Sequence, residues 1–250
     1  MYNEIRNKKE RLKSRMPFSA AVTADIARMN LEDMLYTGLR LSGSELSREQ
    51  VRAMLAGEVV REATVYEHVA MERYRELLNE MVNLSEMQNS LNLDTLLHLY
   101  GILTDSDTSE NVYRRNDPVV YELSYNPPDF LDVPEQMDIL MKWMARENSE
   151  SESEFQGNEL LKAAHFHCRL IEIFPFKEGN RDIARIGLYY YMMSKGYPVF
   201  SFNFSESEYN SAIAAYLKRE DIAPLYNGLE RSLFNKLDMM EMMTTGENED

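Results

Sequence analysis

Two apolar segments meet at residues 170–185, which read LIEIFPFKEGNRDIAR. In the first segment, residues 157–173, and in the second, residues 180–195, apolar side chains recur every three or four residues, which is typical of helices. The turn between them contains Pro175, Gly179 and Asn180. A helix that starts after such a turn leaves its first backbone N–H groups without partners inside the helix. The stretch therefore predicts two helices joined by a turn, with an anion-binding site at the start of the second helix.

The residues of the turn suit a phosphate group accompanied by a metal ion. Gly179 and Asn180 can adopt the left-handed backbone that points successive amides at one oxygen atom. The carboxylate of Glu178 is a ligand that a hard cation such as Mg²⁺ accepts. Arg185 lies about one turn into the second helix and adds positive charge. We interpret the turn as a cradle for phosphate with a metal.

The same residues resemble the motif of the Fic (Fido-domain) family, H-P-F-x-[D/E]-G-N-G-R-x-x-R. Aligned without a gap, residues 174–185 keep the Pro, Phe, acid, Gly, Asn and final Arg, but they lose the His, the second Gly and the first Arg. The resemblance implies transfer of AMP from ATP to a target hydroxyl, with the His as general base. It implies ATP, or another nucleotide, and Mg²⁺ as ligands. The residues implied are Glu178 at the metal and Gly179, Asn180, Arg181 and Arg185 at the phosphates.

Phe174 stands at the family's His position, and a phenyl ring has neither a lone pair nor acid–base chemistry. Since a positioned general base typically contributes about 10²–10⁴-fold to a rate, we predict an impaired protein adenylyltransferase that keeps its nucleotide-binding loop. Two alternatives stay open. One is an active nucleotidyl transferase with another base, such as Asp182, Glu178 or a group of the substrate. The other is a peptide-binding interaction module with a blocked nucleotide site.

Two arrangements of the arginines are compatible with the sequence. If one residue of the turn is deleted relative to the family, Arg181 replaces the missing arginine and shares a helix face with Arg185. If nothing is deleted, Asp182 stands three residues before Arg185 and can pair with it, which fills the cradle with the protein's own charge. Asn180 also has a plainer interpretation, as the N-cap of the second helix.

The resemblance extends on both sides of the motif. Residues 160–167 resemble the helix before it, with His167 at the usual structural histidine, and residues 195–198 resemble the turn after it. Residues 36–47 resemble the segment that carries the inhibitory helix of many Fic proteins, which has the pattern Ser-x-x-x-Glu-Gly. Here Gly38 takes the serine position and Ser42 the glutamate position. Catalytic base and inhibitory acid are thus missing together, as expected where no activity needs restraint.

The rest of the chain predicts a mainly α fold, a Fic-type helical bundle. Polar residues at helix starts predict N-caps at Ser47, Thr64, Asn92 and Ser205. Ser47, Thr64 and Ser205 are also followed three residues later by Glu or Gln, which is the pattern of a capping box. Only residues 112–125 show strand-like alternation, around a polar turn at residues 116–118, and they predict a short β-hairpin. The resemblance implies that this hairpin is a flap next to the active-site loop, which captures an extended segment of a target protein by strand pairing.

We expect an N-terminal leader or helix over residues 1–24 and a Fic-like domain over residues 25–243. Residues 25–60 of that domain include the remnant of the inhibitory-helix segment. A polar loop is expected at residues 148–154, and residues 244–250 are expected to be a disordered acidic tail. A chain of 250 residues is long enough to bury a proper core.

Composition excludes several classes of function. A formal net charge of −15 argues against nucleic-acid binding, which depends on Lys and Arg that neutralise phosphates. Cys168 is the only cysteine, so no internal disulfide can form and a reducing compartment is expected. Residues 1–18 lack the apolar core of a signal peptide, and no window approaches a membrane span. We therefore expect a cytoplasmic protein with a nucleotide and a target protein as partners, and homo-oligomer formation stays open.

Overall fold

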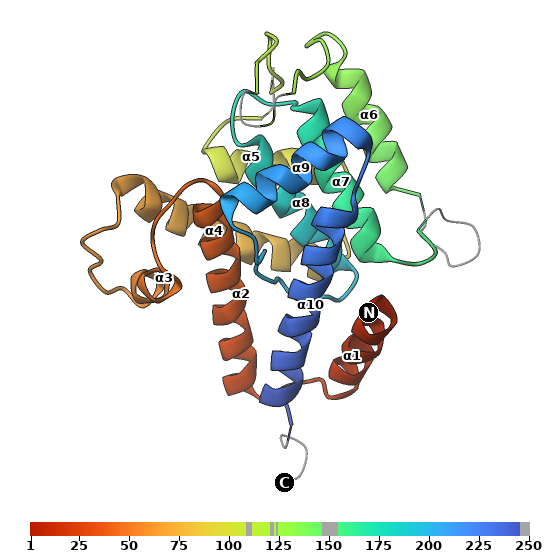
Figure 1. The fold of residues 1–250 in the computed structure, drawn as a ribbon. Helices are drawn as coiled ribbons and strands as arrows, with labels where there is room; N and C mark the ends of the chain where they lie inside the picture. Colours follow the sequence, from red (N-terminus) through yellow and green to blue (C-terminus); the bar gives the residue numbers. More distant parts are fainter. Residues whose placement is uncertain (109–111, 121–122, 124, 147–154, 246–250) are drawn as a thin grey trace.

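The computed structural model describes residues 1–108, 112–120, 123, 125–146 and 155–245. Within these residues ten α-helices form, which confirms the predicted mainly α fold (Figure 1). They are α1 (Tyr2–Ser14), α2 (Ala20–Leu41), α3 (Arg48–Leu55), α4 (Val65–Glu86), α5 (Leu93–Thr104), α6 (Val133–Met144), α7 (Glu159–Ile173), α8 (Asn180–Ser194), α9 (Glu206–Arg219) and α10 (Ala223–Met243).

The pair α7 and α8, which carries the motif loop between its members, lies at the centre of the fold (Figure 1). Helix α8 packs on α7, α5 and α4, and α7 packs in turn on α6, α9 and α10. At Gly187 of α8, a Cβ atom would lie 2.6 Å from a ring carbon of Phe166 on α7, so a glycine is needed for this close approach. Most residues of the two helices are therefore buried.

Helix α1 lies beside α10, and α2 is linked to α10 by charge (Figure 1). Ile5 and Leu12 of α1 are buried, and the buried Lys8 donates to Asp238 at 2.8 Å and to Glu241 at 2.7 Å. On the other side, Lys236 of α10 donates to Asp33 of α2 at 2.8 Å, with both side chains buried. Residues 1–24 thus include a helix that packs on the domain that follows.

The predicted N-caps are confirmed. The side chains of Ser47, Thr64 and Ser205 accept from the N3 backbone in complete capping boxes, and Asn92 caps α5 through a bond from Thr95 N–H at 2.9 Å. Helix α2 starts after Ser19 and continues through Gly38 to Leu41. The segment that resembles the inhibitory helix is therefore the C-terminal end of α2.

The predicted hairpin at residues 112–125 is wrong, since the described part of this segment contains two isolated β-bridges and no strand. Val120 pairs with Tyr125, and Tyr113 pairs with Phe176 of the motif loop. Pro118 has no N–H group to give to a ladder, so it interrupts regular pairing. Residues 121, 122 and 124 of the predicted hairpin lie outside the described residues. The segment is anchored on the motif loop instead of forming a flap of its own.

Two further expectations fall wholly or largely outside the described residues. These are the polar loop at 148–154 and residues 246–250 of the predicted tail. Thr244, at the start of that tail, is buried and accepts a hydrogen bond from Arg15 at 2.8 Å. None of the helices in the described ranges has the length and apolar character needed to cross a membrane.

Candidate phosphate-binding site

The motif loop reverses the chain through two residues with left-handed backbone. Phe174 ends α7 with φ of 49°, and Gly179 precedes α8 with φ of 69°. The first helical bond of α8 runs from Ile183 N–H to Gly179 O at 2.9 Å. The backbone N–H groups of residues 180–182 therefore have no acceptor inside the helix, which is the donor set that the sequence predicts for an anion.

Asn180 holds the loop in this shape with its side chain. Its Oδ1 accepts from Phe176 N–H at 2.9 Å, and its Nδ2 donates to Phe176 O at 2.8 Å. The N-cap interpretation of Asn180 is therefore wrong, because Gly179 is the N-cap residue and no side chain caps α8. Phe176 is fully buried and stacks on Tyr100 with ring centroids 3.9 Å apart. The side chain of Asn180 is thus committed to the loop, and its backbone N–H remains for a ligand.

Arg185 pairs with Asp182, as expected for an alignment without a deletion. Arg185 is 1% exposed, and Asp182 also accepts a hydrogen bond from Tyr74 Oη at 3.0 Å. Burial by itself would lower the pKa of the Arg185 guanidinium, but the adjacent charge of Asp182 raises it above its ordinary value. Arg185 is therefore a buried cation that holds a carboxylate of the protein, whereas Arg181 lines the hollow in front of the loop.

A polar chain continues from Arg185 into the core. The guanidinium carbon of Arg185 lies 5.8 Å from the ring centroid of Tyr209, whose hydroxyl is 2.8 Å from His167 Nε2. Burial lowers the pKa of His167 to about 3, so this imidazole is neutral. His167 is thus a buried structural histidine, which is the role that the resemblance implies.

Tyr74 links the loop to the end of α2, and the sequence analysis missed it. A Cβ atom at Gly38 would lie 2.1 Å from Tyr74 Oη, so only glycine leaves room for this hydroxyl to reach Asp182. A glycine inside a long helical pattern often marks such a close approach, and Gly38 was the available signal. The helix end that resembles the inhibitory segment therefore lies against Tyr74, whose hydroxyl donates to Asp182 in the first turn of α8.

A hollow of about 250 Å³ lies in front of the loop. Its lining includes Ser42, Val120, Phe174, Glu178, Arg181 and Asp182, so the predicted site residues of the loop and Ser42 come together. A second hollow of about 170 Å³ lies beside it and shares Glu178, Gly179 and Asp182 with the first. Each is smaller than the roughly 300–1,000 Å³ of an ordinary ligand pocket, so each can receive phosphate groups but not a whole nucleotide.

Magnesium fits this site only together with a phosphate ligand. Glu178 is exposed, and no group of three or more His, Cys, Asp or Glu side chains within the described ranges is placed to hold a metal ion. Mg²⁺ is usually held by one or two carboxylates plus the phosphates of the substrate, and it keeps several waters. One carboxylate at the edge of the phosphate loop meets that requirement.

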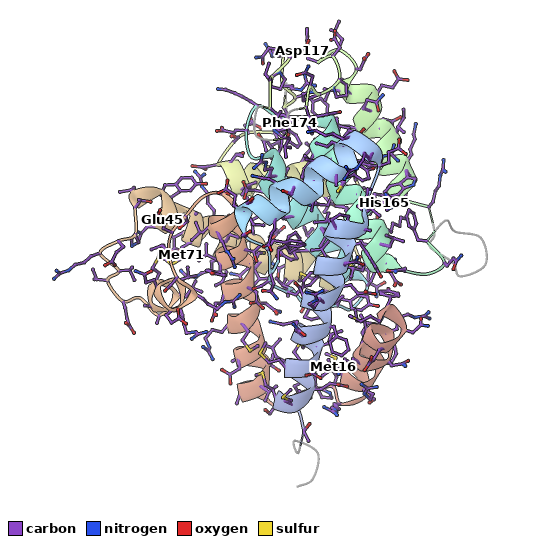
Figure 2. All side chains as sticks on the ribbon, in the orientation of Figure 1. Met16, Glu45, Met71, Asp117, His165 and Phe174 are labelled. Carbon is purple, nitrogen blue, oxygen red and sulfur yellow. The ribbon has the colours of Figure 1, made fainter. Side chains whose placement is uncertain are left out.

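Arg114 fixes the loop from the other side, and the sequence analysis did not single it out. Its side chain is 4% exposed and donates to the carbonyls of Phe174 at 2.8 Å and Asn116 at 2.9 Å, and to that of Pro128. It also pairs with Asp117 at 2.9 Å. Figure 2 labels Asp117 and Phe174 at the same end of the molecule. Arg114 therefore satisfies backbone carbonyls at the end of α7, directly behind the phosphate loop.

Comparison with known proteins agrees with this geometry. Residues 90–192 match the Fic/DOC family. The chain is 28% identical over 169 residues to the protein adenylyltransferase fic-1 of Caenorhabditis elegans, an alignment that covers 66% of this chain and 32% of that protein. The chain thus spans about a third of the length of the curated relative.

Solved structures share the fold. A Fic domain containing signaling protein from Bacteroides thetaiotaomicron has a TM-score of 0.78 at 20% identity and covers 98% of both chains. IbpAFic2 in complex with adenylylated Cdc42 has a TM-score of 0.55 at 17% identity, over 93% of this chain and 70% of that one. The architecture around α7 and α8 is therefore that of a Fic fold. The family match at residues 90–192 lies within this fold and covers the motif loop.

Arg114→Lys is expected to destabilise the protein although it keeps the charge. An ammonium cannot reproduce the forked donor set, so one or more buried carbonyls lose their partner at a cost of about 1–3 kcal/mol. Urea unfolding at pH 7 measures this loss. The matched control is Arg115→Lys at the exposed neighbouring position, which is expected to stay within about 0.5 kcal/mol of the unaltered protein. Equal effects of the two changes would contradict the role given to Arg114.

His167 predicts a dependence of stability on pH. Its pKa is about 3 in the folded protein and about 6.5 in an unfolded chain, so the unfolded state binds more protons between these values. Stability is therefore retained above pH 6.5 and falls as the pH drops toward 3, by up to about 1.4 kcal/mol per pH unit. Urea unfolding between pH 7 and 4 is expected to show a shallower slope for His167→Gln. His68→Gln, at an exposed histidine, is the control, and parallel slopes for all three proteins would refute the prediction.

Proposed function

We propose that this chain is a catalytically impaired Fic-type protein that binds the phosphates of a nucleotide, with Mg²⁺, at the start of α8. The observation that carries the proposal is the placement of Phe174. Its ring lines the same hollow as the loop whose amides at residues 180–182 have no helical acceptor. The family position that would take a proton is thus held by a group without acid–base chemistry.

Other acid groups at the loop are poor replacements for a general base. The Oδ1 atom of Asp182 accepts from both Arg185 and Tyr74, so this oxygen is already engaged by the protein's own donors. Glu178 is exposed, and the proposal assigns it to the metal. These contacts weigh against the active transferase with an alternative base.

Phosphate binding has support from the backbone. Three successive N–H groups at a helix start, together with the positive end of the helix dipole, attract an anion without any particular side chain. Asp182 in the first turn of α8 opposes this attraction, because its charge lies at the same helix end. We therefore expect weak binding, with the phosphates in the hollow and the nucleoside outside it.

The proposed protein partner is a target segment beside residues 112–120. The named activity of the curated relative is protein adenylylation, and one structural neighbour was solved with adenylylated Cdc42. In this chain, Arg114 N–H donates to Pro175 O at 2.9 Å, which brings residues 112–120 onto the motif loop. A target held there would lie next to the phosphates.

A second candidate function follows from the ion pair of Asp182 and Arg185. Since that pair fills the inner part of the cradle with protein charge, the chain can serve as an interaction module that binds a peptide but no nucleotide. The two candidates differ in nucleotide affinity, so binding separates them.

Calorimetric titration with ATP, ADP and GTP, each with and without Mg²⁺, is the first test. We expect weak binding of the nucleotides that Mg²⁺ strengthens, and about three- to tenfold tighter binding by Asp182→Asn, which keeps a hydrogen-bond acceptor for Tyr74 but removes a like charge. Because this change also leaves Arg185 without its anion, circular dichroism verifies that the variant is folded before it is titrated. Ser42→Ala is the control at the same hollow and is expected to leave affinity unchanged. Heat of binding from neither the unaltered protein nor Asp182→Asn would reject the nucleotide site and support the interaction module.

Phe174→His tests the missing base. If only the proton acceptor is lost, an imidazole with a pKa of about 6.5 beside the phosphates is expected to restore self-modification with ATP and Mg²⁺, seen as added AMP by intact mass. Phe174→Leu is the control without acid–base chemistry. If Phe174→His alone is silent, we expect rescue when Arg181→Gly and Asp182→Arg are added, because phosphoryl-type transfer depends on positioned charge. Equal activity of the unaltered protein would overturn the impaired-enzyme proposal, and silence of the triple variant would favour the interaction module.

A further inference from the structure

A larger cleft lies at the other end of the molecule and takes no part in the proposed function. Its volume is about 720 Å³, within the roughly 300–1,000 Å³ of ordinary ligand pockets. It is formed by α1, the turn after α1, α2, the C-terminal end of α8 and α10. Figure 2 labels Met16 of this cleft and Phe174 of the phosphate loop at opposite ends of the structure. A ligand here would therefore bind independently of a nucleotide.

The floor of the cleft is apolar. Leu12, Leu237 and Met240 are buried, and Phe18 and Ile26 are half-buried against the core. These side chains come from three helices and a loop, so they form a concave surface and not a stripe along one helix. Burial of an alkyl chain on such a surface favours binding because apolar area is removed from water.

The rim is basic, in a chain whose formal net charge is −15. Lys9, Lys13 and Lys195 line the cleft with one carboxylate, that of Glu10. Lys9 is already engaged, because it donates to Lys195 O at 3.2 Å and lies 4.5 Å from the ring centroid of Tyr197. Within the part of the chain that the structure describes, Lys13 and Lys195 have no carboxylate partner. Lys195 Nζ lies 5.6 Å from the ring centroid of Tyr191, a contact that leaves its N–H donors for an anion. Lys13 and Lys195 therefore place two ammonium groups without a carboxylate at the edge of the apolar hollow.

We propose that this cleft binds a small amphipathic monoanion, a carboxylate on an alkyl chain of medium length. The carboxylate lies between Lys13 and Lys195, and the alkyl chain lies on Phe18, Ile26 and Met240. A single charge fits better than a polyphosphate, because Glu10 repels additional negative charge and Lys9 is committed. The apolar floor excludes a fully polar ligand, since its groups would lose water without gaining hydrogen bonds.

Decanoate is the probe, measured by calorimetry on the full chain, with decanol and decyltrimethylammonium at the same chain length. Decanoate is expected to bind at least about tenfold more tightly than either of them. The double change Lys13→Gln with Lys195→Gln is expected to weaken decanoate about threefold per lysine and to leave decanol unchanged, as for partly exposed ion pairs. Its matched control is Lys218→Gln with Arg219→Gln, two exposed positive charges on α9 outside the cleft.

A second variant tests the apolar part without relying on charge. Ile26→Trp fills the floor and is expected to abolish binding of both decanoate and decanol, while circular dichroism verifies that the helices are retained. Equal affinity for decanoate and decanol, equal effects of the two double changes, or no binding at all would overturn the proposal. Attachment only to phosphatidylserine vesicles, with no binding of free decanoate, would also overturn it and indicate a membrane surface instead.

Discussion

The buried ion pair between Asp182 and Arg185 is the interaction on which the rest of the site depends. A guanidinium that is 1% exposed stays charged, so it needs an anion beside it, and removal of one partner of a buried pair costs about 3–5 kcal/mol. Asp182 supplies that anion and is held in turn by Tyr74. Tyr74 reaches it only because Gly38 has no side chain. The buried charge of Arg185 in α8 thus explains why Tyr74 is needed in α4 and why Gly38 is needed in α2.

The shape of the motif loop is held by contacts that do not involve the side chain at position 174. Asn180 bonds the backbone of Phe176 twice, Tyr100 stacks on Phe176, and Arg114 satisfies carbonyls at the end of α7. None of these contacts uses the side chain of Phe174. Under the proposed function, the absence of a base at position 174 therefore leaves the amides at the start of α8 organised, so binding and chemistry can be tested separately.

Features that depend on neighbouring residues, such as helices and their N-caps, could be predicted from the sequence. Contacts between residues far apart in the chain could not. Capping boxes and apolar spacing located the helices, and the position of Ser42 beside the loop followed from the resemblance. The alternation at residues 112–125 predicted a hairpin, but the described part of this segment forms only isolated bridges. The partner of Tyr113 is Phe176, about 60 residues away, and no local pattern reports that. The pairing of Arg185 with Asp182 was one of two alternatives that the sequence left open, because the choice depends on the burial of Arg185. The turn of the Asn180 side chain toward Phe176 depends on the loop's own geometry.

The central claim is that the amides at the start of α8 bind phosphate, and that Phe174 leaves the site without a general base for AMP transfer. The most direct measurement is an NMR titration of the ¹⁵N-labelled protein with ATP and Mg²⁺, following backbone amide shifts. The account predicts that Asn180, Arg181 and Asp182 show the largest shifts, saturating with one affinity, and that the protein mass stays unchanged. Saturating shifts confined to other segments, or no shifts at these three amides at high ATP concentration, would contradict it.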